Sequence, residues 1–237
     1  EVSECTDGEN RSSDAGSGSL HSRRFCGLRL SKRVDRTVQT DQLARMSTQS
    51  DYAHLRIEGY AVVSDDDRIA DSAGLMPDAL KNDAEWAFFQ AGLDAADVNV
   101  LGRKSHDLTP NHKNRRRLIM TRSVTGVELR EDGVFWNSDG ATLAEALSCF
   151  DCEVQSLAVA GGRDVFDYFL SGAARYSTFF LSRMHGVTLP DGVGVFTRVN
   201  SAGEAAEDIL AAYGFEGGEQ RVIDDGVSVV GWTPRAE

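Results

Sequence analysis

Short apolar segments alternate with segments of helical pattern between residues 56 and 184, and this alternation constrains the fold more than any other feature. Strands are expected at 56–63, 98–101, 117–121, 134–136, 154–160 and 177–181, and helices at 83–93, 141–147 and 164–170. Such alternation predicts an α/β domain with a mainly parallel central sheet flanked by helices. Residues 64–82 are polar and predict a loop, and 202–213 have a helical pattern.

The C-terminal region has a different pattern. Two apolar segments, 220–223 and 227–232, are separated by Asp224-Asp225-Gly226. A short turn of this composition between two apolar segments predicts an antiparallel hairpin.

The first 45 residues differ from the rest in composition. They are rich in Ser, Arg, Asp and Gly and show no apolar period of 2 or 3.6, so no core face can be drawn on them. We expect residues 1–45 to be a disordered extension or sequence translated from a misassigned start, followed by one domain over 46–237. A targeting peptide is the alternative, favoured by the basic residues of 23–33 and opposed by the acidic residues of 1–9.

Charge and cysteine content exclude several classes of protein. The chain has 37 acidic and 25 basic residues and a net charge of −12, which argues against nucleic acid as a partner. No run of 18 apolar residues is present, so no membrane-spanning helix is expected. Four cysteines in 237 residues are too few for a disulfide scaffold, and the default expectation is a reducing cytoplasm.

Three segments at the ends of expected strands have the chemistry of phosphate binding. Gly102–Ser105 offers backbone N–H groups and two cations, Thr121–Ser123 offers hydroxyls and a guanidinium suited to the 2′-phosphate of NADPH, and the glycines of Ala160–Val165 allow close approach of a pyrophosphate. Taken alone, the first segment is more typical of a solvated turn and the second of a surface arginine, and the third fits close helix–strand packing as well as it fits a pyrophosphate. The candidate cofactor residues are Gly102, Arg103, Lys104, Ser105, Thr121, Arg122, Ser123, Ala160, Gly161, Gly162, Arg163, Asp164 and Val165.

Glu85 is the candidate catalytic acid. It lies one helical turn before Phe89 and therefore on the same face of the expected helix. If that face lines an apolar cleft, desolvation raises the pKa of the carboxyl group. The alternative is a solvated Glu in the first turn, stabilised by the helix dipole.

Other polar groups are expected to have no ligand. Cys149 and Cys152 form a lone C-x-x-C pair, His106 and His112 are expected at the surface, and Asp65–Asp67 lacks the spacing of a calcium loop. No metal site is predicted.

Taken together, these segments resemble dihydrofolate reductase over about residues 57–184. The similar segments are Asp67–Ala70 with Met76-Pro77, EWAFFQ at 85–90, VLGRKS at 100–105, RRRLIMTRS at 115–123, LAVAGGRDVFDYFL at 157–170 and FFLSRM at 179–184. The resemblance implies that Glu85 is the active-site carboxylate and that the Gly161–Gly162 peptide is cis. It implies substrate contacts from Phe89 against a pterin, Arg115 on the glutamate tail of folate, Ser182 as a pocket hydroxyl, and Val63.

The implied activity is NADPH-dependent hydride transfer to a pterin, with 7,8-dihydrofolate reduced to tetrahydrofolate. Asp78 stands where the family has Trp, and the resemblance fades after Met184. Two alternatives remain. One is a reductase of another heterocycle, such as the riboflavin-pathway aminopyrimidine, whose reductase has the same fold and a similar first loop. The other is a relative that has lost catalysis.

Overall fold

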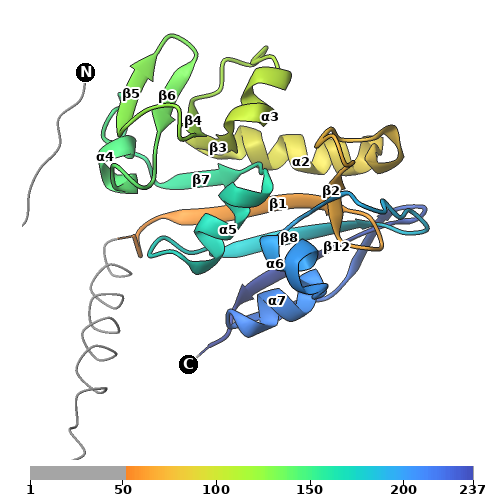
Figure 1. Cartoon of the computed structure of the whole chain (residues 1–237). Coiled ribbons are helices and arrows are strands. Elements are labelled where there is room, and N and C mark those ends of the chain that lie inside the picture. The colour runs from red at the N-terminus through yellow and green to blue at the C-terminus, as the bar shows by residue number, and fades with distance from the viewer. Residues whose placement is uncertain (1–51, 237) are drawn as a thin grey trace, which may run out of the picture.

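A ten-stranded sheet forms the centre of the computed structural model, which describes residues 52–236 (Figure 1). The segment 1–45, with its predicted extension or leader, lies outside the described residues. The strands of the sheet are β1 (Arg56–Val63), β3 (Val98–Gly102), β4 (Arg117–Met120), β5 (Val127–Arg130), β6 (Gly133–Trp136), β7 (Ser156–Val159), β8 (Thr178–Met184), β10 (Phe215–Gly217), β11 (Arg221–Asp224) and β12 (Val227–Pro234).

The sheet is mostly parallel, as predicted. Its order is β10-β12-β8-β1-β7-β3-β4-β6-β5, with β11 paired to β12. Every neighbouring pair from β8 to β6 is parallel, whereas β5, β10, β11 and β12 pair antiparallel. The predicted C-terminal hairpin is confirmed as β11–β12. A separate small antiparallel sheet pairs β2 (Arg68–Ala70) with β9 (Val193–Gly194).

Helices cover both faces of the sheet (Figure 1). One face packs in the main core with α4 (Leu143–Leu147), α5 (Arg163–Ser171), α6 (Thr197–Ala202) and α7 (Ala206–Ala212). The other face packs against α2 (Asp83–Ala95), where Leu93 meets Tyr60 of β1 and Ala158 of β7. The short α3 (Arg103–Leu108) follows β3 directly, and η1 (Asp78–Leu80) precedes α2. No helix among the described residues is long and apolar enough to cross a membrane.

The start of α2 is fixed by a side-chain cap. Asn82 has an extended backbone, and its side-chain oxygen accepts hydrogen bonds from the N–H groups of Ala84 and Glu85. The observed cap satisfies two of the N–H groups that a helix start leaves without partners, and it holds Glu85 in the first turn.

Several segments differ from the sequence prediction, which also lacked β9, α6 and β10. The expected loop 64–82 contains β2 and η1. Strand β5 was not predicted, because it is an edge strand with an exposed face. The expected helix 202–213 is shorter, since α6 ends at Ala202 with Gly203 in the left-handed conformation at φ 65° and α7 begins only at Ala206.

Candidate active site

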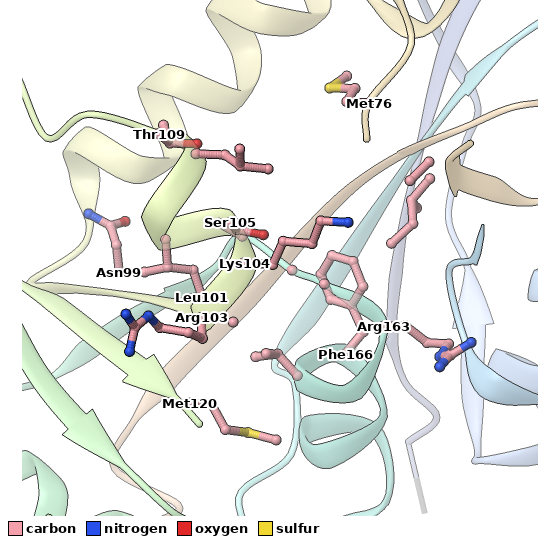
Figure 2. Close-up of a pocket in the computed structure, with 18 of the residues that line it drawn as sticks. Met76, Asn99, Leu101, Arg103, Lys104, Ser105, Thr109, Met120, Arg163 and Phe166 are labelled. Carbon is pink, nitrogen blue, oxygen red and sulfur yellow. The ribbon is translucent and has the colours of Figure 1, made fainter. Parts of the chain in front are cut away.

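A single large cleft brings together most of the predicted site residues. Its volume is about 1650 Å³, and it lies between α2, α3, the start of α5 and the loop after β2 (Figure 2). Glu85, Phe89 and Arg115 line it, as do all thirteen candidate cofactor residues at 102–105, 121–123 and 160–165. The three phosphate-type segments are therefore neighbours in space although they are far apart in the chain.

Val63 does not belong to this cleft, so the sequence assignment is corrected here. Its side chain is fully buried in the main core, whereas Val62 lines the cleft. Successive side chains of a strand point to opposite faces of the sheet, so adjacent positions face different environments.

Glu85 lines the cleft but has little access to water. It is 5% exposed, and burial raises the pKa of its carboxyl group to about 7. A hydrogen bond with the buried hydroxyl of Ser182 partly opposes this increase in pKa. At neutral pH the carboxyl group is thus poised between its protonated and ionised forms.

An aromatic wall adjoins this acid. The rings of Trp86 and Phe89 lie 5.6 Å apart, and Tyr60 meets the Phe89 ring edge-on at 6.3 Å. Trp86 is 52% exposed although it lines the cleft. Flat apolar surfaces beside one buried carboxyl group suit a planar heterocycle with N–H donors on its edge.

The Gly161–Gly162 peptide is cis, as the resemblance implied. The Gly102 N–H donates to the carbonyl of Gly161 at 2.8 Å, which fixes this peptide against the end of β3. Gly161 has φ +98°, and a Cβ there would lie 2.9 Å from the Phe166 ring. A Cβ on Gly162 would meet no protein atom within 4 Å, so this glycine faces open space in the cleft.

The start of α5 has polar groups that could bind the pyrophosphate of a dinucleotide. Gly162 caps α5 without a side-chain hydrogen bond, so the first N–H groups of this nine-residue helix have no side-chain cap. The buried Nε of Arg163 donates no hydrogen bond, although it lies 3.5 Å from Asp164 Oδ1 in an ion pair. Positive partial charge at a helix start and an unpartnered guanidinium N–H suit a pyrophosphate.

Basic groups of α3 reach different parts of the cleft. Lys104 extends across the pocket toward the segment that carries Met76, and its ammonium group donates to the Ala73 carbonyl (Figure 2). Arg103 pairs with Asp107 at 2.7 Å and lies over the Phe135 ring. Both line the cleft, but Asp107 already balances the charge of Arg103, whereas Lys104 forms no ion pair within residues 52–236 and its charge is free to attract an anion.

The 2′-phosphate candidates lie together on an exposed turn after β4. The Thr121 and Ser123 hydroxyls are 3.0 Å apart, and the Ser123 N–H donates to Thr121 Oγ1. Arg122 between them is exposed and forms no ion pair with any residue in 52–236. The turn therefore offers an unoccupied guanidinium beside two hydroxyls.

Arg115 is already engaged at its own end of the cleft. Its guanidinium pairs with Asp94 at 2.5 Å and donates to Gln90 Oε1 at 2.7 Å, so α2 holds it in place. Lys113 pairs with the same Asp94 at 2.6 Å. The Asp94 carboxylate thus forms ion pairs with both Arg115 and Lys113.

Sequence reasoning missed Asn99 and Arg117, which also line the cleft. Both are buried polar residues in otherwise apolar strands, and a polar residue in such a strand is the sequence pattern that could have indicated them. His106 was expected at the surface, but its ring is mostly buried and bonds to Asp132 and Arg117. His112 lines the cleft mouth.

Other singled-out groups lie away from the chemistry of the cleft. Cys149 and Cys152 are free thiols, and no cluster of three or more potential metal ligands occurs within residues 52–236. Asp67 is structural, since it pairs with Arg183 at 2.6 Å and accepts from the Ala206 N–H. Asp78 is exposed and pairs with Lys81, so it does not cover the cleft as a tryptophan would.

Comparisons with known proteins show the fold. No family model matches the chain, and no curated protein matches it in sequence. It is similar to the structure of a putative riboflavin biosynthesis protein from Shewanella sp. PV-4, with a TM-score of 0.56 and 18% identity over 77% of this chain and 100% of that one.

It is also similar to a diaminohydroxyphosphoribosylaminopyrimidine deaminase/5-amino-6-(5-phosphoribosylamino)uracil reductase from Thermotoga maritima, with a TM-score of 0.56 and 15% identity over 84% of this chain. This chain spans 62% of that protein's length. At such identities the likeness shows the dihydrofolate reductase-like fold, which riboflavin-pathway reductases share.

Proposed function

We propose that this protein is an NADPH-dependent reductase of a nitrogen heterocycle, and that its substrate is a phosphoribosylaminopyrimidine of the kind named for the Thermotoga maritima protein. One observation carries the proposal. A buried carboxyl group with a pKa of about 7, that of Glu85, shares a cleft with the glycine peptide and basic turns suited to a dinucleotide. The similarity to two riboflavin-pathway proteins favours the aminopyrimidine over dihydrofolate.

Glu85 binds the edge of the ring. An ionised carboxylate accepts two parallel hydrogen bonds from an amino group and the adjacent ring N–H, in a charge-assisted pair. Phe89 packs against the face of the ring and fixes its orientation. Ser182 donates to the carboxylate and thereby holds the acid in the orientation that meets the ring.

Dihydrofolate is the second candidate, because a pterin presents the same pair of donors and because Glu85 and Phe89 match the family motif. The state of Arg115 counts against it. The guanidinium expected to bind the glutamate tail is taken up by Asp94 and Gln90. A folate tail would have to displace an internal ion pair to reach it.

NADPH supplies the hydride when it is bound. Gly161, Gly162 and the first N–H groups of α5 would hold its pyrophosphate, with Arg103 and Lys104 neutralising the charge. Thr121, Arg122 and Ser123 would hold the 2′-phosphate. With a pKa of about 7, Glu85 is partly protonated at neutral pH. In that form it can supply a proton to the substrate nitrogen, whereas its ionised form accepts from the edge of the ring.

The test is an assay with two substrates. The purified protein should quench the fluorescence of NADPH on binding, and it should oxidise NADPH when the phosphoribosylaminouracil is added. Dihydrofolate should support a much slower reaction. Binding of NADPH without oxidation by either substrate would reject the proposal and favour a non-catalytic relative, and faster turnover of dihydrofolate would favour the second candidate.

Replacing Arg122 with Ala should change the choice of cofactor. A charge-assisted hydrogen bond to phosphate is worth roughly 1.5–3 kcal/mol, so the affinity for NADPH should fall about tenfold or more. The affinity for NADH should stay nearly constant, because NADH lacks the 2′-phosphate. Fluorescence titration with both cofactors measures this difference, and an equal loss for the two would contradict the assignment of the turn.

A further inference from the structure

A second cationic position lies in the floor of the cleft, apart from the residues assigned to cofactor or ring. Arg117 of β4 is only 8% exposed and lines the cleft beside Asn99 of β3, its register partner on the neighbouring parallel strand. Asn99 is 4% exposed. Figure 2 shows Asn99 on the side of the pocket where Leu101 and Thr109 also lie.

No carboxylate of the described residues bonds to the Arg117 guanidinium directly, although Asp132 lies beyond His106. Nη1 of Arg117 donates to the Thr109 carbonyl at 2.8 Å and contacts His106 Nδ1 at 3.3 Å, and no carboxylate of residues 52–236 forms an ion pair with it. Burial, and then the nearby charge of Arg115, lower the pKa of the Arg117 guanidinium, and the charge of Asp132 opposes this decrease. Buried charges in proteins are normally paired, so an unpaired buried cation facing a cleft is suited to an anionic ligand.

The neighbours of Arg117 hold its guanidinium in place. Arg117 can only donate, so His106 accepts at Nδ1 and carries its proton on Nε2, which faces Asp132 at 2.8 Å. The chain Asp132–His106–Arg117 therefore fixes one guanidinium nitrogen and leaves the other N–H groups to a ligand. Arg115 and Lys113 differ, because Asp94 pairs with both.

Asn99 adds an unmet acceptor. Its side-chain Oδ1 is buried and has no hydrogen-bond partner. A buried acceptor without a donor costs free energy unless a ligand supplies one. The Arg117 guanidinium can bind an anionic group, and the Asn99 amide oxygen can accept a hydrogen bond from a hydroxyl or N–H beside that group.

We propose that Arg117 and Asn99 form the subsite for an anionic arm of the substrate, either the phosphate of a sugar phosphate or a carboxylate beside an amide. This inference rests on the proposed function and names the part of the substrate that lies away from the ring. Gln90, which holds Arg115, lies five residues after Glu85 on α2, or about 7.5 Å along the helix axis at 1.5 Å per residue. The arm of a ring bound at Glu85 would run along α2 toward Gln90 and Arg115, and the charge of Arg115 is close enough to act on Arg117.

The experiment measures binding of isolated arms by calorimetry, without cofactor. Ribose 5-phosphate represents the phosphate arm and p-aminobenzoylglutamate the carboxylate arm, with ribose as the uncharged control. We expect the protein to bind one of the charged arms and not ribose. Arg117→Met should weaken that binding about tenfold or more, as expected for loss of a charge-assisted contact.

Arg116→Met is the matched control. Arg116 is adjacent in sequence, exposed and paired with Asp151, so its loss should leave arm binding within about twofold, as for other surface substitutions. If Arg117→Met fails to fold, Asn99→Asp serves instead, because a carboxylate placed there pairs with Arg117 and competes with the anion. It should cause a similar loss of arm binding with an unchanged thermal midpoint.

The outcomes separate this subsite from the proposed function. Failure of both charged arms to bind, unchanged binding in Arg117→Met, or an equal loss in Arg116→Met would overturn the subsite even if the protein oxidises NADPH with its substrate. Loss of arm binding specific to the Arg117 and Asn99 variants supports the subsite even if no NADPH oxidation is found.

Discussion

Replacing Glu85 with Gln is expected to lower the turnover of the heterocyclic substrate at neutral pH by about two or more orders of magnitude, within the range of positioned acid–base groups. The substitution keeps the size of the side chain but removes both the charge that pairs with the ring edge and the exchangeable proton. NADPH binding should survive, because the cofactor segments lie on other elements. Steady-state turnover and NADPH titration of the same preparation measure the two effects.

Asp83→Asn is the control for this variant. Asp83 is an exposed acid in the first turn of the same helix, so its neutralisation should leave turnover nearly unchanged. Near-normal turnover of Glu85→Gln would reject the catalytic assignment. Equal losses in the two variants would instead point to a general effect on the helix.

The stability of the unmutated protein should depend on pH in a defined direction, because Glu85 titrates differently in the folded and unfolded states. Folding raises the pKa of Glu85 from 4.5 to about 7, so the folded state binds the proton more tightly. The resulting stabilisation is fully present below about pH 4.5 and is lost as the pH rises through about 7. At one pKa unit per 1.36 kcal/mol this amounts to about 3 kcal/mol at most. Glu85→Gln should lack this dependence in chemical unfolding at pH 5 and pH 8, to within about half a kcal/mol.

Replacing Gly162 with Ala should abolish much of the NADPH affinity while leaving the fold intact. Its backbone has φ −77°, which any residue adopts, and the added Cβ would meet no protein atom within 4 Å. If the cofactor backbone passes over this peptide, the methyl group occupies space that the pyrophosphate needs. We expect affinity to fall about tenfold or more, with a change in unfolding free energy within about 0.5 kcal/mol. Fluorescence titration and thermal unfolding measure these quantities.

Gly126→Ala is the matched control, because its added Cβ would make only an ordinary contact at 3.7 Å and it does not line the cleft. Unchanged NADPH affinity in Gly162→Ala would place the pyrophosphate elsewhere. A large loss of stability in the same variant would mean that the peptide has a structural role.

Much of the fold was predictable because its signals are local. Strand β1 begins and ends at the predicted residues 56 and 63, since its apolar run is bounded by polar segments. The three phosphate-type segments were found from glycines and cations at strand ends, and parallel strands bring such ends to one edge of a sheet. The raised pKa of Glu85 could be predicted only on the condition that its helix face lines an apolar cleft, and that cleft is visible only in the folded structure.

The remaining features depend on contacts between distant segments. Val62 faces the cleft and Val63 faces the main core, and because both are valines the sequence does not show which of them points to which side of the sheet. Arg117 is one of three consecutive arginines, and burial alone separates it from the exposed Arg116. The pairing of Asp94 with Arg115 joins α2 to the loop before β4, so no local pattern indicates it.

The position of β1 has a consequence for how the chain reaches its native state. The first strand of the described chain lies in the middle of the sheet, where Arg56 pairs with Ser156 and Glu58 with Thr178, partners 100 and 120 positions later. Closing such long loops is entropically costly, and topologies dominated by distant pairings fold slowly. During synthesis β1 therefore stays unpaired, with its apolar side chains exposed, until β7 and β8 have left the ribosome. Until then it is a candidate for chaperone binding or for association with the wrong partner.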